Sequence, residues 1–362
     1  MQSYPVASID LSALKHNLSR VKQLAPASRV MSVIKANAYG HGYEQVAQAL
    51  IDSDAFAVAR LSEGIRLREV GVQKPIVILE GVMTADDFQL AADYSLSIVF
   101  HNLAQIERVT TITLSAPLTF CWLMVETGMH RLGLATHKIS KAMQLLSASS
   151  NISDQPGLMS HFSSAELTND PRNQQQLEVL LHYAEQYNTP ISMANSAALI
   201  SFTDSQGEWV RPGLMLYGVS PFDDQSASDL DLKPVMQLKS AVIAIQQLQA
   251  GDQVGYGGDW TASQQTRVGI VSIGYGDGYN RQLSDVGRVV IEEQTVPVLG
   301  RVSMDMIAID LSAISDASLG DEVTLWGHDL LSVEQVAQQA RTIPYELLCQ
   351  ISARVTREYH HG

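Results

Sequence analysis

The sequence predicts an α/β protein with an N-terminal (β/α)8 TIM barrel and a C-terminal, mostly-β domain. Two patterns carry the prediction. Over about the first 225 residues, eight short apolar runs alternate with amphipathic segments, as in a parallel barrel. After that point the chain changes to short strand-like runs separated by glycine turns. We therefore divide the chain into a barrel domain, residues 1–225, and a β domain, residues 226–362.

The apolar runs are the candidate barrel strands. In chain order they are 30–34, 55–59, 75–79, 96–100, 118–125, 157–161, 191–194 and 209–211. A doubly wound open sheet produces the same alternation of strands and helices, so it is the main competing architecture.

Amphipathic segments precede and separate these runs. The first has Asp10 as a candidate N-cap and places Leu11, Leu14 and Leu18 at helical spacing. The predicted helices are 10–24, 43–51, 62–69, 85–92, 102–110, 138–147, 169–187 and 196–200.

The β domain begins after a polar linker, 223–231, that is rich in Asp and Ser. Its candidate strands are 235–249, 267–273, 288–291, 295–299, 306–311 and 322–326. One clear amphipathic helix is predicted, 332–341, with Ser332 as its N-cap.

Composition excludes several classes of function. The 362 residues are 46% hydrophobic, enough for two cores, and carry a formal net charge of -14 without a basic cluster. Nucleic acid and anionic membranes are therefore not expected partners. Neither a signal peptide nor an apolar stretch of membrane-spanning length is visible. The two cysteines, Cys121 and Cys349, are far apart and lack metal-ligand spacing, so we expect no metal site and a cytoplasmic location.

One stretch, 33–42 with the sequence VIKANAYGHG, places Lys35 where a buried strand opens into a turn. An unpaired ammonium there is unfavourable by several kcal/mol. The default interpretation is a lysine paired with a carboxylate. The alternative is a desolvated amine kept for Schiff-base chemistry.

Polar residues also follow other apolar runs, and in a barrel these positions meet at one rim. Arg131 follows the fifth run, His161 ends the sixth, Ser196 follows the seventh, and Arg211 ends the eighth. Each alone is more simply a structural residue: an ion-paired arginine, a core histidine or a helix N-cap. Together with Lys35 they predict a site. Helix starts at Ser196 and after Gly213 suit a phosphate.

Two glycine-rich stretches, 255–258 and 274–279, superficially resemble dinucleotide-binding loops. No helix pattern follows either of them, so we reject that interpretation. Tyr275 in the second stretch would by default be a half-buried packing residue.

Seven motifs in this order resemble those of bacterial alanine racemases, and they cover nearly the whole chain. They are VIKANAYGHG (33–42), TGMHRLG (127–133), SHF (160–162), ANSAA (194–198), VRPGLMLYG (210–218), GYGDGY (274–279) and GRVSMD (300–305). The resemblance implies a pyridoxal 5'-phosphate enzyme that interconverts L- and D-alanine and supplies D-alanine for peptidoglycan. It also implies a head-to-tail homodimer, with the first few residues forming a strand of the β domain.

The resemblance further implies residue roles. Lys35 would bind the cofactor covalently and act as the base on the D-alanine face, and Tyr275 of a second copy would act on the L-alanine face. The remaining implied contacts are Tyr39, Asn195, Ser196, Gly213 and Leu214 around the phosphate, Arg211 with His161 behind it at the ring nitrogen, and Arg131 with the partner's Met304 amide at the substrate carboxylate.

The chemistry suits these residue types. Racemisation removes a proton from one face of Cα and returns one to the other, so two bases on opposite faces are needed. Lysine and tyrosine side chains have intrinsic pKa values of about 10, which burial or nearby positive charge must lower. An arginine such as Arg211 does not give up its proton at neutral pH, so it would leave the ring nitrogen of the cofactor unprotonated.

Two departures from the family pattern bear on specificity. Met124 stands where many relatives carry a carbamylated lysine, so chloride or Glu126 would have to orient Arg131 instead. Ala353 stands where several relatives place a tyrosine at the pocket mouth, which leaves strict alanine specificity open. A serine or broad-specificity racemase is the main alternative. A non-catalytic cofactor carrier or a decarboxylase of the same fold fits less well, because the chain has a β domain, Arg211 and Tyr275.

Overall fold

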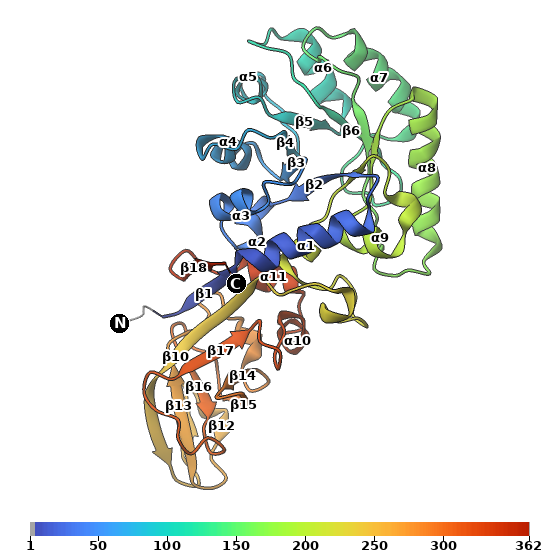
Figure 1. Cartoon of the computed structure of the whole chain (residues 1–362). Coiled ribbons are helices and arrows are strands. Elements are labelled where there is room, and N and C mark those ends of the chain that lie inside the picture. The colour runs from blue at the N-terminus through green and yellow to red at the C-terminus, as the bar shows by residue number, and fades with distance from the viewer. Residues whose placement is uncertain (1–3, 362) are drawn as a thin grey trace.

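The structure is a computed structural model that describes residues 4–361. Figure 1 shows an elongated molecule with the barrel at one end and the β domain at the other. A closed barrel of eight parallel strands is followed by a mostly-β domain, so the predicted fold class is confirmed.

The barrel strands coincide with the eight predicted runs; seven of them are shorter, and β2 is shifted by one residue toward the N-terminus. They are β2 (Arg29–Val33), β3 (Ala55–Val58), β4 (Ile76–Ile78), β5 (Ser97–Phe100), β6 (Trp122–Met124), β7 (Gly157–Met159), β8 (Ile191–Ser192) and β9 (Trp209–Val210). The barrel closes because β9 pairs in parallel with β2. The fifth run is shortened most, since Leu118 forms only an isolated bridge, to Ile152.

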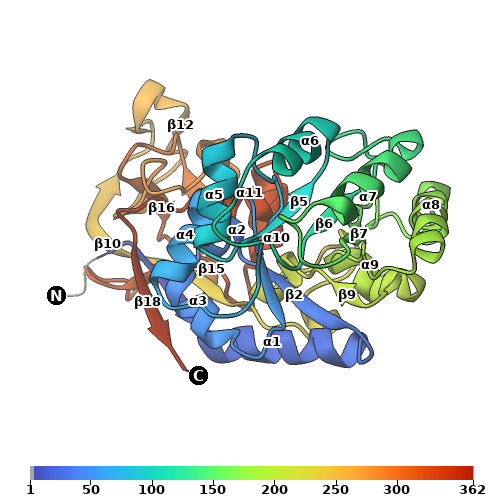
Figure 2. The ribbon, with the colours of Figure 1, turned by 90° about the horizontal axis from the view of Figure 1, so that it is seen from above.

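Helices surround these strands, as seen along the barrel in Figure 2. They are α1 (Leu11–Leu24), α3 (Tyr43–Ala49), α4 (Leu61–Glu69), α5 (Ala85–Asp93), α6 (Leu103–Thr111), α7 (Ile139–Ala148), α8 (Pro171–Tyr187) and α9 (Ser196–Ser201). Asp10 caps α1 as predicted: its Oδ1 accepts from Ser12 N at 2.7 Å and Ala13 N at 3.0 Å. Two short segments, α2 (Lys35–Tyr39) and the 3-10 turn η3 (Leu214–Tyr217), lie after β2 and β9.

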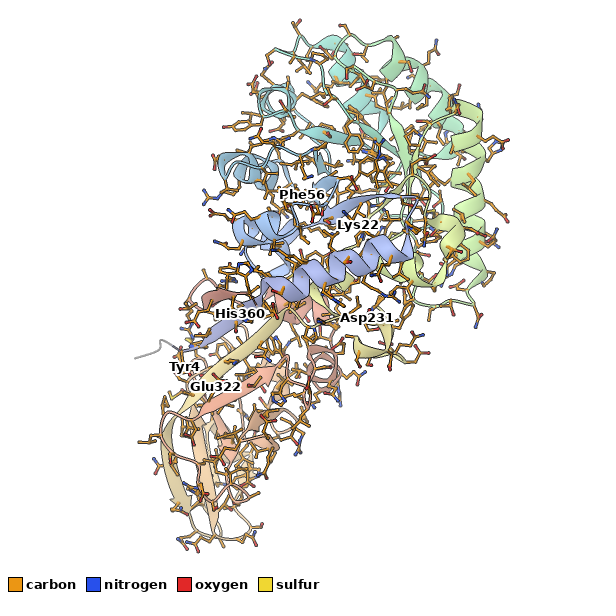
Figure 3. The ribbon with its side chains drawn as sticks, in the orientation of Figure 1. Tyr4, Lys22, Phe56, Asp231, Glu322 and His360 are labelled. Atoms are coloured by element: carbon orange, nitrogen blue, oxygen red, sulfur yellow. The ribbon has the colours of Figure 1, made fainter. Side chains whose placement is uncertain are left out.

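Large apolar side chains fill the barrel domain. Phe56 on β3, labelled in Figure 3, is fully buried, as are Met31 on β2 and Trp122 on β6. This packing fixes the strand ends from which the polar residues project.

The β domain is built on a sheet that closes on itself. Its ring order is β10, β13, β16, β15, β14 and β17, and β17 returns to β10. The strands are β10 (Met236–Leu248), β13 (Thr266–Val271), β14 (Arg288–Ile291), β15 (Gln294–Leu299), β16 (Ile307–Asp310) and β17 (Glu322–Trp326). The N-terminal strand β1 (Val6–Asp10) pairs antiparallel with β10 and parallel with β18 (Thr356–His360).

The predicted helix after Ser332 is present as α10 (Val333–Gln339). The expectation of a single clear helix in this domain was wrong, because α11 (Pro344–Cys349) follows it. Three strands were also not predicted: β11 (Gln253–Val254), β12 (Trp260–Thr261) and β18. The first two contain two residues each, and β18 is polar with no fully buried residue, so none shows an apolar run.

None of the helices within residues 4–361 has the length and apolar character needed to span a membrane.

Candidate active site

A cavity of about 920 Å³ opens at the carboxyl ends of the barrel strands. The structure brings together all the predicted site residues of the barrel domain in its lining: Lys35, Tyr39, Arg131, His161, Asn195, Ser196, Arg211, Gly213 and Leu214. Residues far apart in sequence therefore meet at one place because parallel strands all end at the same rim.

Lys35 lies in this cavity immediately after the buried end of β2, where Ile34 N donates to Ala57 O at 2.9 Å. Its ammonium forms no ion pair with any residue in the described range 4–361. Burial, and then the charge of Arg131, lower the pKa of Lys35, while Glu63 and Glu80 act in the opposite direction. The salt-bridge interpretation of this lysine therefore has no support in the structure.

The turn that follows, residues 35–42, is called the lysine turn below. Its residues 36–39 all have positive φ, between 51° and 54°. Such left-handed backbone is unfavourable by about 1–2 kcal/mol per non-glycine residue. His41 supports it from within, because its Nδ1 donates to Ala38 O at 3.0 Å and Tyr39 O at 2.9 Å. The conformation turns Tyr39 into the domain, where its ring stacks on Tyr217 with 4.7 Å between centroids.

Arg211 is buried and tied to two neighbouring strands. Its Nη1 donates to Ser192 O and Ser192 Oγ at 2.5 and 2.8 Å, and its Nη2 donates to Ser160 O at 2.6 Å. Burial, and then Arg131, lower the pKa of Arg211 to about 10, so the guanidinium is still charged at neutral pH. Its Nε has no hydrogen-bond partner among residues 4–361, which leaves one donor for a group in the cavity.

His161 stands behind Arg211, with 3.3 Å between Arg211 Nη2 and His161 Nδ1. Since the guanidinium can only donate, Nδ1 accepts and the ring proton lies on Nε2. Burial, and then the charge of Arg211, lower the pKa of His161 to about 3. The imidazole is therefore neutral at physiological pH.

The start of α9 and the start of η3 meet beside Tyr39. Asn195 caps α9 by accepting from Ala198 N at 3.0 Å, and Ser196 Oγ accepts from Gly213 N at 3.1 Å. Gly213 is needed here, because a Cβ atom would lie 2.7 Å from the Tyr39 hydroxyl oxygen. Two hydroxyls and the amides of two helical starts thus converge, and this donor set suits a phosphate.

The cavity therefore fits the expected cofactor. An amine without a counter-ion, an arginine donor and a phosphate-type cluster all face the same space, and pyridoxal phosphate carries an aldehyde, a ring nitrogen and a phosphate. No group of three or more His, Cys, Asp or Glu side chains arranged to hold a metal occurs within the described chain.

Arg131 follows β6 and is exposed at the cavity. Met124, which lies at the position of the relatives' carbamylated lysine, is buried and also lines the cavity. Glu126 does not replace that lysine, because its Oε1 accepts from Gly128 N at 2.5 Å and lies 3.7 Å from His130 Nδ1. In the described part of the chain, Arg131 has no hydrogen-bond or ion-pair partner, so nothing in a single chain fixes its guanidinium.

Sequence reasoning missed the contribution of the β domain to the cavity. Tyr345 and Cys349 from α11 and the preceding Ile343 all line it. The Tyr345 ring lies 5.9 Å from that of Tyr39, and burial raises the pKa of Tyr345 to about 12. Burial also raises the pKa of Cys349, against the opposing charge of Lys35. Pro344 at the first helical position was the signal that could have revealed α11.

Ala353, expected at the pocket mouth, does not line the cavity of the single chain. Tyr345, eight residues earlier in the sequence, occupies the lining instead. The alanine therefore contributes no side chain to the lining of this cavity.

Tyr275 and Met304 do not line the cavity either; both lie on the surface of the β domain, 43% and 53% exposed. Two backbone hydrogen bonds hold their turns together, Tyr275 N to Ser303 O at 3.0 Å and Gly276 N to Met304 O at 2.9 Å. The structure thus places the two residues side by side but outside the lysine cavity of their own chain.

Comparison with known proteins identifies the same family that the sequence motifs resemble. Residues 9–221 match the family described as alanine racemase, N-terminal domain, and residues 235–359 match alanine racemase, C-terminal domain. An alanine racemase of Aeromonas hydrophila is 42% identical over 98% of this chain and 99% of its own length. One of Legionella pneumophila is 45% identical over 96% of this chain and 97% of its own.

Solved structures agree with these sequence matches. The biosynthetic alanine racemase of Pseudomonas aeruginosa superposes with a TM-score of 0.93 at 39% identity, covering 99% of this chain and 100% of that one. The alanine racemase of Bartonella henselae, which has covalently bound pyridoxal phosphate, superposes with a TM-score of 0.90 at 27% identity, covering 99% and 100%. The chain therefore belongs to the alanine racemase family.

Proposed function

We propose that this chain interconverts L- and D-alanine with Lys35 of one subunit and Tyr275 of a second subunit as the two bases. The observation that carries the proposal is the state of Lys35. It faces the cavity without a counter-ion and with a lowered pKa, beside an arginine that has one free donor in the described chain.

The cofactor is pyridoxal 5'-phosphate, which when bound draws electron density from Cα of an attached amino acid and so acidifies its proton. Lys35 Nζ would bind it covalently. Arg211 Nε, supported by His161, would donate to its ring nitrogen. Its phosphate would lie against Tyr39, Ser196, Gly213 and Leu214, with Asn195 holding the start of α9.

The chain's own residues then divide the proton transfer between two faces. Lys35 takes or returns the Cα proton on the D-alanine face, and Tyr275 does the same on the L-alanine face. Arg131 binds the substrate carboxylate together with the backbone amide of Met304. Because the two bases stand on opposite faces, a proton lost to one is replaced from the other, which inverts the configuration.

Exposure on the β domain supports a second subunit in the site. Besides Tyr275 and Met304, other apolar side chains of the β domain are exposed, including Ile243 at 49%, Tyr256 at 72% and Met306 at 44%. Exposed aromatic and methionine side chains are enriched at subunit interfaces. A head-to-tail homodimer would cover such side chains and bring Tyr275 and Met304 to the partner's cavity.

The test is a pair of variants assayed in both directions by chiral chromatography. Lys35→Ala and Tyr275→Phe should each lower racemisation by roughly 10²- to 10⁴-fold, the usual contribution of a general acid–base group. In D2O, Tyr275→Phe should still exchange the Cα proton of D-alanine, because Lys35 serves that face. Tyr187→Phe is the control, since it alters a tyrosine at the end of α8 that does not line the cavity. Normal racemisation by Tyr275→Phe would show that the two-base assignment is wrong.

The same assay tests the substrate. We expect alanine to be turned over faster than serine or lysine, and the reverse order would contradict the proposal. We also propose a cytoplasmic location, supported by two cysteines that are far apart in sequence, and D-alanine as a precursor of peptidoglycan.

A further inference from the structure

We propose that one C-terminal segment, residues 348–359, positions both bases: it holds the lysine turn and, separately, the turn that carries Tyr275. The identities of the two bases rest on the proposed function. The segment runs from the end of α11 into β18, at the junction of the two domains, where His360 is labelled in Figure 3.

On the lysine side, two long side chains of β18 reach the end of the lysine turn. Arg357 Nε donates to Gly40 O at 2.6 Å, and the Tyr359 hydroxyl donates to His41 O at 2.9 Å. A run of positive-φ residues persists only where its surroundings hold it. Arg357 and Tyr359 supply that restraint from more than 300 positions away in the sequence.

Residues 274–279, the tyrosine turn, are held from the same segment by Arg354. Its Nε donates to Asp277 Oδ1 at 2.6 Å and its Nη2 to Asp305 Oδ1 at 2.7 Å. The second oxygen of Asp277 accepts from Gly274 N at 2.8 Å and so closes the turn around Tyr275. One guanidinium therefore joins the turn that carries Tyr275 to the loop that carries Met304.

Burial makes the contact between Arg354 and Asp277 more than a surface ion pair. The Asp277 side chain is 4% exposed, whereas that of Asp305 is 54% exposed. Without Arg354, the Asp277 carboxylate would be buried without its counter-ion, and the turn would have to open to hydrate it. Loss of the Arg354 charge should therefore displace the turn that carries Tyr275.

Both turns also pack against the same short backbone segment, residues 348–352. A Cβ atom on Gly40 would lie 2.1 Å from Leu348 O, and one on Gly278 would lie 2.5 Å from Gln350 O. Ser352 N in addition donates to Asp277 O at 3.0 Å. Because these are contacts between main chains, a shift of residues 348–352 moves both turns. If Tyr275 serves the partner's cavity, the segment links the lysine of one site to the tyrosine of the other.

The first test is Arg354→Gln in the holoenzyme. Hydrogen–deuterium exchange read by mass spectrometry should be roughly 10-fold or more faster in peptides covering 274–279, since local opening sets exchange rates. Turnover should fall by roughly 10- to 100-fold, the loss that a displacement of about 1 Å can cause. The primary isotope effect should rise for Cα-deuterated L-alanine and fall for Cα-deuterated D-alanine, because the Tyr275 step becomes limiting.

Tyr359→Phe should produce the opposite asymmetry. It removes only the hydroxyl that binds His41 O, so exchange should increase in peptides covering 35–43 and remain unchanged in 274–279. The isotope effect should then rise for D-alanine and fall for L-alanine, because the Lys35 step becomes limiting. A general loss of stability would not move the two substrates in opposite directions.

Arg267→Gln is the matched control. Arg267 lies in the same domain and donates to Ile314 O at 2.7 Å and Ser315 O at 2.9 Å, but it contacts neither turn. It should lower the thermal midpoint without changing either isotope effect. Asp305→Asn, an exposed change, keeps the proposal testable if Arg354→Gln does not fold. It removes one contact of Arg354 with the Met304 loop, which is itself hydrogen-bonded to the tyrosine turn, and should raise KM for alanine more than it lowers kcat.

The outcomes separate this inference from the proposed function. Unchanged exchange at 274–279 in Arg354→Gln, or at 303–306 in Asp305→Asn if the first variant does not fold, would overturn the positioning role. The same asymmetry in Arg267→Gln would also overturn it. Faster exchange with isotope effects that stay symmetrical would support the positioning role and show that Tyr275 is not the second base.

Discussion

Met124 stands where many relatives carry a carbamylated lysine, and this difference changes how Arg131 can be oriented. A thioether at position 124 cannot carry negative charge, and Glu126 is bound within its own loop. No carboxylate of the described chain therefore orients Arg131, so an anion such as chloride or the substrate carboxylate itself would have to do so. Arg131 and Lys35 share the cavity with the charged Arg211, and none of the three is paired with a carboxylate of the described chain, which favours an anionic ligand.

Arg131→Met should therefore raise KM for alanine by roughly 10- to 100-fold, because a hydrogen bond to a charged group contributes about 1.5–3 kcal/mol. Steady-state kinetics with both enantiomers measure the change. Met124→Leu is the matched control: it preserves the apolar volume and should leave KM unchanged. A rise in KM for Met124→Leu as large as that for Arg131→Met would contradict the view that Met124 only packs.

His41 predicts a pH dependence of stability. Burial lowers its pKa from 6.5 to about 4, and nearby Arg357 acts in the same direction, against the two backbone carbonyls that accept from Nδ1. Between pH 6.5 and about 4 the unfolded chain binds a proton here that the folded chain does not. The free energy of unfolding must then decrease as pH falls through this window, by roughly 3 kcal/mol in all.

His41→Asn removes this titration while its amide keeps a donor near the position of Nδ1. Urea midpoints of the holoenzyme, measured from pH 7 to 4.5 at fixed protein and cofactor concentrations, should show a shallower pH slope in the variant. His137→Asn, which removes an exposed imidazole, serves as the control. An unaltered slope in His41→Asn would mean that other groups cause the acid sensitivity.

At the scale of elements, the strand before the lysine turn could be predicted from the sequence. The backbone conformation of the turn itself depends on tertiary contacts. The apolar run before Lys35 was a sufficient signal for β2. Nothing local predicts four successive positive-φ residues at Ala36, Asn37, Ala38 and Tyr39, since only Asn tolerates that region readily. Their conformation depends on His41 and on side chains of β18, a pairing that no short-range pattern encodes.

Gly40, which follows these four residues, gives a direct test of that dependence. Gly40 has φ of 82° and Gly71 has φ of 90°, so an alanine meets similar backbone strain at both, about 1–2 kcal/mol. A Cβ atom on Gly71 meets nothing within 4 Å, whereas one on Gly40 lies 2.1 Å from Leu348 O. Gly40→Ala should therefore lower the thermal midpoint well beyond Gly71→Ala and reduce racemisation as well.

Calorimetry and the chiral assay on the two variants make the comparison. Gly71→Ala should keep wild-type turnover, because this glycine lies outside the cavity and away from α11. Equal losses in the two variants would mean that the contact between the lysine turn and Leu348 adds nothing to the backbone strain.

At the scale of the whole molecule, the order of apolar runs was enough to predict the barrel and to bring Lys35, His161 and Arg211 to one rim. The closed sheet of the β domain was not predictable in the same way. β10 pairs not only with β13, which follows it, but also with β1 and β17, which are distant from it in sequence. The place of α11 at the cavity depends on that closure, so Tyr345 and Cys349 were missed along with it.

The proposed sharing of a site between subunits predicts complementation. A heterodimer of a Lys35→Ala chain and a Tyr275→Phe chain, purified through two different tags, contains one cavity with an intact Lys35. If Tyr275 acts across the interface, that cavity receives an intact Tyr275 from the other chain, and the heterodimer should show about half of the wild-type turnover. Each parent homodimer should be nearly inactive.

A second heterodimer reverses the expectation and serves as the control. It pairs a wild-type chain with a chain that carries both Lys35→Ala and Tyr275→Phe. With Tyr275 acting across the interface, each cavity then lacks one base, so this heterodimer should be nearly inactive despite containing a complete wild-type chain. Were Tyr275 to act within its own chain, the second heterodimer would keep about half of the activity and the first would have none. The pair of measurements therefore assigns the tyrosine to one subunit or the other, because the same four side chains are present in both and only their distribution between chains differs.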